Sequence, residues 1–159
     1  MQDAGTVIEL LQQRLHALND LNLTLKHIHW NVVGPHFIAV HEMLDPQVDR
    51  VRDMADDVAE RVAALGGVAQ GTPGALIEER TWKEYSVGIV YTGVLEALRS
   101  TIKTVGDIDA ATEDLLIEQL RDLEPFQWSV RTHLETAGGT LTTSDATTEV
   151  EAARQSSQQ

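Results

Sequence analysis

The chain has 159 residues, of which 42% are hydrophobic, and this is enough for one domain with a buried core. It contains no cysteine, which excludes disulfides and thiolate metal ligands. Its 25 acidic and 12 basic residues give a formal net charge of −13, which disfavours nucleic acid and favours cations as partners, although acidity also serves solubility alone.

The first predicted element is a long amphipathic helix. Apolar residues recur at intervals of three and four from Val7 to Val32, the period of one helix face. This pattern predicts a helix of about 27 residues and roughly 40 Å. Gly34 and Pro35 end it, so that His29 lies in its last turn.

The apolar repeat continues over residues 37–62 and predicts a second long helix, with Pro46 inside it. Proline cannot donate the backbone hydrogen bond of its turn, so two interpretations arise. We favour one helix with a kink, because the apolar phase continues across the proline. Alternatively, the helix starts with Asp45 as N-cap and Pro46 at the first position, which leaves His41 on a preceding turn.

The connection that follows is rich in Gly and Pro, and residues 73–79 within it predict a short helix. Thr81 and Glu84 have the spacing of a capping box and open a third long helix, which runs to about Val105.

Asp109 can cap a fourth long helix, which the glycine pair at 138–139 ends. Four helical segments without a strand signal predict an all-α fold, an antiparallel four-helix bundle with a short extra helix between the second and third helices. We assign residues 1–5 to a short leader, 6–137 to the bundle, and 138–159, rich in Thr, Ser, Gln and Ala, to a flexible polar tail.

Neither a membrane span nor an export signal is predicted. No apolar run reaches the length of about 18 residues that a spanning helix needs. The polar start of the chain lacks the basic and apolar regions of a signal peptide. We therefore expect a cytoplasmic protein.

Five residues on the first two helices suggest a metal site: His29, His41, Asp45, Asp56 and Glu60. Two imidazoles and three carboxylates suit iron or its neighbours among the divalent metals. The four residues on the second helix fall within about 100° of its circumference, because each residue turns the helix by about 100°. They form two i,i+4 pairs, whose side chains meet on a helix. For each residue alone, a solvated surface position is the competing interpretation.

One copy of the second helix cannot bring these ligands together. Fifteen residues separate His41 from Asp56, which is about 22 Å along the axis. A second, antiparallel copy would bring His41 and Asp45 of one chain to Asp56 and Glu60 of the other, with two equivalent sites per twofold dimer. We therefore predict a homo-oligomer that shares its metal sites. The remaining histidines have no comparable setting and are interpreted as structural or surface residues: His16, His27, His36 and His133.

Residues 29–45 and 56–61 closely resemble the Dps family (DNA protection during starvation), the ferritin-like mini-ferritins of bacteria. They read HWNVVGPHFIAVHEMLD and DDVAER. The similarity extends over most of positions 7–137 and includes Phe126-Gln127-Trp128 in the last helix.

The resemblance implies a hollow dodecamer with tetrahedral symmetry and a ferroxidase centre between twofold-related subunits. The matching ligands are His29, His41 and Asp45 of one subunit and Asp56 and Glu60 of its neighbour. Trp30 matches an aromatic residue beside the centre, although a core or interface anchor is an equal interpretation. The implied reaction is oxidation of Fe(II), with hydrogen peroxide preferred over oxygen, and storage of the ferric mineral, which protects the cell and its DNA.

The chain departs from the family in its termini, because family members that bind DNA use a Lys- or Arg-rich extension. Residues 140–159 hold three acidic residues against the single Arg154, and no basic residue precedes Arg14. Since phosphate contacts supply most nonspecific affinity, we predict weak or absent DNA binding. The alternative functions are a nucleoid-binding, DNA-protecting shell with little or no ferroxidase activity, and a cage with an inactive site.

The third helix is a second departure. Only 21 residues run from Tyr85 to Val105, about 31 Å if fully helical. Family members carry roughly four more turns between the positions equivalent to Tyr85 and Tyr91, and a loss of about 14 residues nearly preserves helical phase. Gly88 lies at this join and weakens the helix. The third helix is therefore expected to keep the same residues facing the core, while the bundle loses one end.

Further acidic residues are candidates for handling iron. We expect Asp53 and Asp57 to face the cavity, and Asp107 or Asp114 to line an access pore, with solvated surface as the commoner fate of such residues.

Overall fold

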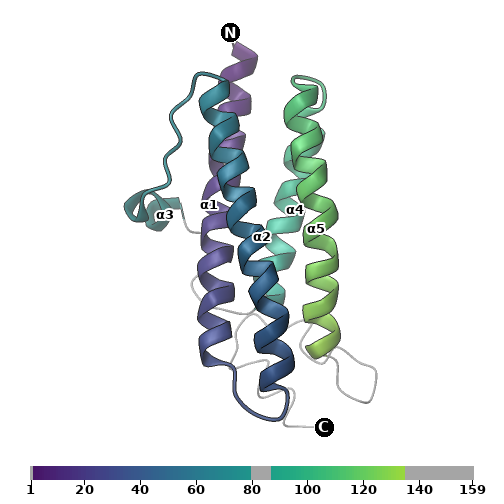
Figure 1. Cartoon of the computed structure of the whole chain (residues 1–159). Coiled ribbons are helices and arrows are strands. Elements are labelled where there is room, and N and C mark those ends of the chain that lie inside the picture. The colour runs from purple at the N-terminus through teal and green to yellow at the C-terminus, as the bar shows by residue number, and fades with distance from the viewer. Residues whose placement is uncertain (1, 80–86, 135–159) are drawn as a thin grey trace.

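The computed structural model describes residues 2–79 and 87–134, in which every regular element is a helix. The all-α prediction is confirmed, including the short helix between the second and third long ones. Figure 1 labels the five helices: α1 Gln2–Asn31, α2 Phe37–Ala64, α3 Pro73–Glu79, α4 Val87–Val105 and α5 Ala110–Leu134.

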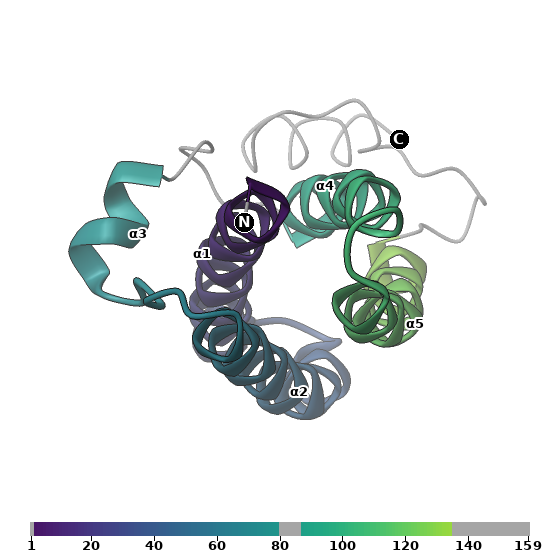
Figure 2. The same ribbon diagram turned by 90° about the horizontal axis from the view of Figure 1, so that it is seen from above.

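The four long helices surround one core. Viewed from above, they follow one another in the order α1, α2, α5, α4 (Figure 2). α1 packs against α2 and α4, and α5 packs against α4 and α2. α2 returns beside α1, α3 lies along the outside of α1, and α4 runs parallel to α2 (Figure 1). Every neighbouring pair is therefore antiparallel, as in ferritin-like bundles with one crossover connection.

α1 is longer than the sequence predicted. It begins at Gln2, so residues 2–5 form its first turn rather than a separate leader. Asp3 in that turn favours the helix, because its charge complements the positive end of the helix dipole. The predicted end is confirmed: after Asn31 the chain turns through Gly34, whose φ of 97° lies in the region that glycine adopts without strain.

α2 is a single helix of 28 residues that contains Pro46 in its interior. The alternative start at Asp45 is therefore wrong, and His41 belongs to the same helix. Leu44 and Val48 are buried on either side of the proline, so core packing maintains the helix despite the missing backbone donor.

The ends of the last two long helices are partly confirmed. α4 spans the 19 residues Val87–Val105, and the capping box predicted at Thr81 and Glu84 lies outside the described residues. Asp109 caps α5, because its Oδ1 atom accepts a hydrogen bond from the backbone N–H of Ala111 at 3.2 Å. The predicted stop at Gly138 and the tail after it also lie outside the described residues.

The core contains apolar side chains from all four long helices. Among those fully buried are Leu11, Leu21, Leu25, Val51, Met54, Val58, Leu95, Leu98, Leu116 and Leu123. Two polar side chains in the core are satisfied: the Tyr91 hydroxyl donates to Gln47 Oε1 at 2.6 Å, and Gln119 Nε2 donates to the Met54 carbonyl at 3.1 Å. Among the described residues, no helix is long and apolar enough to cross a membrane.

Ion pairs on the flank of the bundle join α2 to α5. Arg50 Nε lies 2.7 Å from Asp122 Oδ2, and its Nη2 lies 3.0 Å from Glu118 Oε1. At one end of the bundle, Arg61 of α2 forms an ion pair with Asp109 just before α5, with Nη2 and Oδ2 2.6 Å apart. These two arginines thus have their partners within the subunit.

Candidate metal centre

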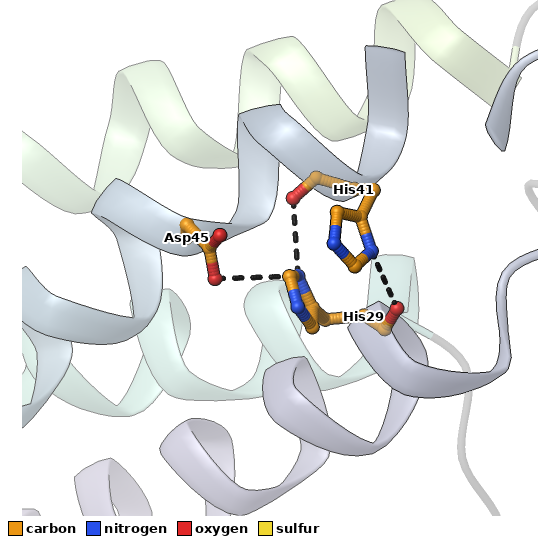
Figure 3. A group of neighbouring side chains, drawn as sticks. All are labelled: His29, His41 and Asp45. Atoms are coloured by element: carbon orange, nitrogen blue, oxygen red, sulfur yellow. Dashed lines mark hydrogen bonds and ion pairs between the residues drawn. The ribbon is translucent and has the colours of Figure 1, made fainter. Parts of the chain in front are cut away.

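His29 and His41 meet where the last turn of α1 lies beside the first turns of α2. The Nδ1 atom of His29 is 3.1 Å from the His41 carbonyl oxygen, and the Nδ1 atom of His41 is 3.0 Å from the His29 carbonyl oxygen. Their rings stack with centroids 3.6 Å apart (Figure 3). The short loop after α1 makes this approach possible, because it returns the chain directly against the helix that it has just left.

The reciprocal contacts decide which ring nitrogen can bind a metal. A carbonyl oxygen only accepts hydrogen bonds, so each Nδ1 must carry the proton and donate. In a neutral imidazole, Nε2 then carries the lone pair. Backbone carbonyls that hold the other ring nitrogen in this way are the usual support of metal-binding histidines. Both rings are thereby prepared as Nε2 ligands.

Asp45 completes a group of three, one turn beyond His41 on α2. Each of the three residues offers a ligand atom, with either ring nitrogen counted for a histidine, and these atoms all lie within 4.8 Å of one another. His29 is buried with 6% of its surface exposed, whereas the side chain of Asp45 is 51% exposed. The group therefore opens to solvent on the carboxylate side, where an ion or a second ligand set can approach.

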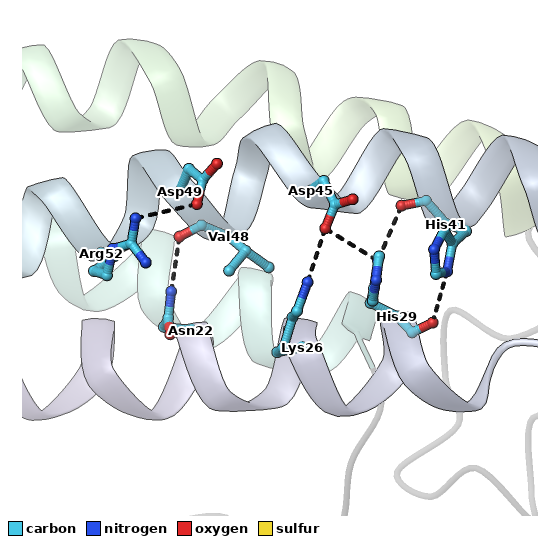
Figure 4. A network of polar contacts seen from close by, with 8 residues as sticks. All are labelled: Asn22, Lys26, His29, His41, Asp45, Val48, Asp49 and Arg52. Atoms are coloured by element: carbon cyan, nitrogen blue, oxygen red, sulfur yellow. Dashed lines mark hydrogen bonds and ion pairs between the residues drawn. The ribbon is translucent and has the colours of Figure 1, made fainter.

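Lys26 also belongs to this neighbourhood, and the sequence analysis missed it. Its Nζ lies 2.9 Å from Asp45 Oδ1, and His29 Nδ1 lies 3.3 Å from the same oxygen (Figure 4). The hydrogen bond from Lys26 is the main cause that lowers the pKa of Asp45, and the nearby histidines act in the same direction. The signal was present in the sequence, because Lys26 precedes His29 by three residues and so lies on the same face of α1.

Asp56 and Glu60 do not join this group within one chain. Both are exposed on α2, and they lie 11 and 15 residues beyond Asp45, about 16 Å and 22 Å along the axis. Among the described residues, the ligand group consists of His29, His41 and Asp45. The single subunit thus presents two separate parts of the predicted ligand set on one helix face.

The other predicted residues occupy varied positions. Trp30 is 69% exposed in the single chain. Asp57 Oδ2 lies 3.8 Å from Arg50 Nη1, and Asp53 is exposed on the same helix. Asp107 and Asp114 are exposed near the turn between α4 and α5.

The remaining histidines behave largely as interpreted. His27, His36 and His133 are exposed. His16 is buried, and its Nε2 lies 2.8 Å from the Gln70 carbonyl, so it joins α1 to the connection that follows α2.

Two imidazole nitrogens and one carboxylate form a ligand set typical of non-haem Fe(II) sites with open positions. The carboxylate offsets part of the charge of the cation, and the imidazoles fix the geometry. Three ligands on one side leave coordination positions for further carboxylates or for an oxidant.

Comparison with known proteins identifies a family of ferritin-like proteins. The ferritin-like domain family matches residues 8–138. A DNA protection during starvation protein of Mycolicibacterium smegmatis is 53% identical over an alignment that covers 94% of this chain and 88% of that protein. The fine tangled pili major subunit of Haemophilus ducreyi is 47% identical, with 85% of this chain and 78% of that protein covered. The solved structure of DpsA14 from Streptomyces coelicolor is 68% identical, with a TM-score of 0.83 over 87% of this chain and 90% of that one.

The alignment with the Mycolicibacterium relative also bears on length. It extends over 162 residues, which is more than the 159 of this chain, so the relative contains residues without a counterpart here.

Proposed function

Because this chain belongs to the Dps family of ferritin-like proteins, we propose that it oxidises Fe(II) at a centre shared between two subunits and stores the product inside a hollow oligomer. The arrangement of His29, His41 and Asp45 is the single observation that carries the proposal. Iron is the substrate of this centre rather than a permanent cofactor.

The second part of the centre comes from a second copy of the chain. An antiparallel pairing of two α2 helices would add Asp56 and Glu60 of the neighbour to the three ligands of the first subunit. Both carboxylates are exposed on the same helix stripe as Asp45, so no part of the chain that the structure describes covers them. A twofold axis repeats the contact and generates two equivalent centres per dimer.

A centre with five ligands can hold two neighbouring iron ions, and this number matters for the chemistry. Two Fe(II) ions give one electron each to hydrogen peroxide, the O–O bond breaks, and two hydroxide ions and two Fe(III) ions result. Because both electrons come from the same centre, no hydroxyl radical is released. Carboxylate oxygens suit the harder ferric product as well as the ferrous substrate.

Storage and protection follow from this chemistry. We propose a dodecamer built from twofold dimers, a cytoplasmic location, and hydrogen peroxide as the preferred oxidant. Sequestration of ferric mineral would protect the cell and its DNA from oxidative damage. With a net charge of −13, the protein should bind DNA weakly or not at all at physiological salt.

The test is an anaerobic titration with Fe(II), followed by addition of peroxide, with particle mass measured on the same sample. Wild-type protein should oxidise iron rapidly, and His41→Ala or Asp56→Ala should reduce the rate to that of iron in buffer. The matched control is His133→Ala, which removes an exposed histidine on α5 and should leave the rate unchanged. Wild-type protein that assembles but oxidises iron no faster than buffer would leave a non-catalytic shell as the better interpretation.

A further inference from the structure

The outward face of α2 carries a stripe of charged residues between the two parts of the proposed centre. Its members fall within about 100° of the helix circumference: His41, Glu42, Asp45, Asp49, Arg52, Asp56 and Glu60. Asp49 and Arg52 occupy its middle, one to two turns beyond Asp45 (Figure 4). Their side chains are 68% and 69% exposed, so the middle of the stripe is open to a partner.

Arg52 is the only cation of α2, which the structure describes throughout, that lies on this stripe. Arg50 and Arg61 point to other sides of the helix, and both hold partners on α5 or just before it. Among the described residues, the ion-pair partner of Arg52 is Asp49, at 3.2 Å between Nη2 and Oδ1. An exposed pair of this kind contributes little to the stability of a subunit.

The pairing proposed for the metal centre fixes what lies opposite these two residues. If Asp45 of one copy faces Asp56 of the other, the twofold axis passes midway between residues 50 and 51 of each helix. Asp49 and Arg52 lie equally far from that midpoint, about 2 Å along the axis on either side. Each Asp49 is therefore at the level of the partner copy's Arg52.

From this register we infer that Asp49 and Arg52 form two reciprocal ion pairs across the twofold axis between copies of this chain. The inference rests on the proposed function, because the register comes from the shared centre. Without Arg52, two stripes of carboxylates would face each other and repel. With it, charges of opposite sign meet at the axis and help hold the helices in the register that assembles the centre.

Charge exchange between two variants can distinguish the Asp49–Arg52 ion pairs across the axis from the Asp49–Arg52 ion pair within each chain. In Asp49→Arg, positions 49 and 52 are both basic, and in Arg52→Asp both are acidic. Each variant alone should dimerise more weakly than wild type, by on the order of tenfold in dissociation constant, because like charges meet twice at the axis. A mixture of the two should form heterodimers, since both contacts across the axis then join opposite charges.

The readout is native mass of differently tagged subunits, with helical content measured for each variant. The double variant D49R/R52D should dimerise like wild type, because exchange restores both kinds of contact. Repair in the double variant but not in the mixture would mean that only the pair within one chain matters, and it would overturn the inference. Single variants that dimerise like wild type would also overturn it.

The matched control is Arg99→Glu, which breaks an exposed ion pair with Glu124 between α4 and α5, at 2.8 Å, and should leave the dimer unchanged. Failure of this inference can be separated from failure of the proposed function. If wild type dimerises and oxidises iron while the mixture does not pair, the ion pairs are wrong and the shared centre stands. If wild type dimerises without oxidising iron, the proposed function fails whatever the mixture does.

Discussion

Replacement of Lys26 by methionine should increase the affinity of the centre for a divalent ion. The ammonium of Lys26 lies 2.9 Å from an oxygen of Asp45 that an ion would use. A metal bound to that oxygen would lie about 2.1 Å from it, and so up to about 5 Å from the ammonium. Methionine has a similar length and no charge, so it removes the repulsion and retains most of the packing.

The size of the effect follows from these distances and from exposure. A unit charge and a divalent ion about 5 Å apart repel each other by about 1–2 kcal/mol at the permittivity of water. Lys26 is 32% exposed and can turn away from an incoming ion, which reduces this energy. Undiminished, this energy would correspond to about fivefold to thirtyfold in affinity, and with the reduction we expect a gain of about threefold to tenfold.

Calorimetric titration with Co(II), a redox-stable substitute for Fe(II), measures this gain directly, and Lys103→Met on the exposed face of α4 is the matched control. The gain should shrink as salt is added, because salt screens exposed charges. An affinity that falls in Lys26→Met would refute the reasoning, since it would mean that Lys26 orients Asp45 for the metal rather than competing with it.

Two further predictions concern stability. Arg14 is buried, burial lowers its pKa, and its Nε and Nη1 atoms have no hydrogen-bond partner among the described residues. Arg14→Met should therefore raise the free energy of unfolding, measured by urea titration, by about 1–3 kcal/mol. A lower free energy of unfolding in the variant would show that the guanidinium has a stabilising partner. Asp109→Asn should lower it by about 1–2 kcal/mol, because Asp109 caps α5 and pairs with Arg61. Hydrogen bonds from Thr112 and Arg61 lower the pKa of Asp109 in the folded state, so its contribution is fully present above the ordinary pKa near 3.8 and is lost as pH falls below it. In the variant this part of the acid dependence should disappear, and an unchanged acid profile would contradict the assignment.

The fold could be predicted from the sequence because its signals are periodic and local. The apolar repeat marked the long helices, and the Asp109 cap and the short helix at 73–79 carried their own local signals. The start of α1 was placed wrongly because residues 2–5 lack an apolar repeat, although they extend a helix that already exists at little cost. Whether the helix continues through Pro46 depends on the packing of Leu44 and Val48 in the core. This is a tertiary effect that local helix propensity does not predict.

The site was predictable only in part, for a geometric reason. Helical phase located His41 and Asp45 on one face, but not the return of the chain that stacks the His29 ring on His41. The donation of each Nδ1 to the opposite backbone carbonyl depends on that return, so no pattern in the sequence could indicate which ring nitrogens are available. Lys26 was missed because a basic residue does not belong to a ligand pattern, although it shares the face of His29.

The division of the proposed centre between two chains links metal binding to assembly. In the proposed centre, three ligands would lie on one subunit and two on the other, so the iron ions held between them would have a higher affinity for the dimer than for the monomer. Linkage then requires that the ion stabilise the dimer by the same factor by which dimerisation increases the affinity for the ion. The stripe on α2 would make this coupling strong, because its carboxylates would face the interface and outnumber Arg52 in each chain. The charge that repels two empty subunits is thus the charge that binds iron, and the reciprocal pairs of Asp49 and Arg52 reduce that repulsion at the axis without occupying the ligands at either end.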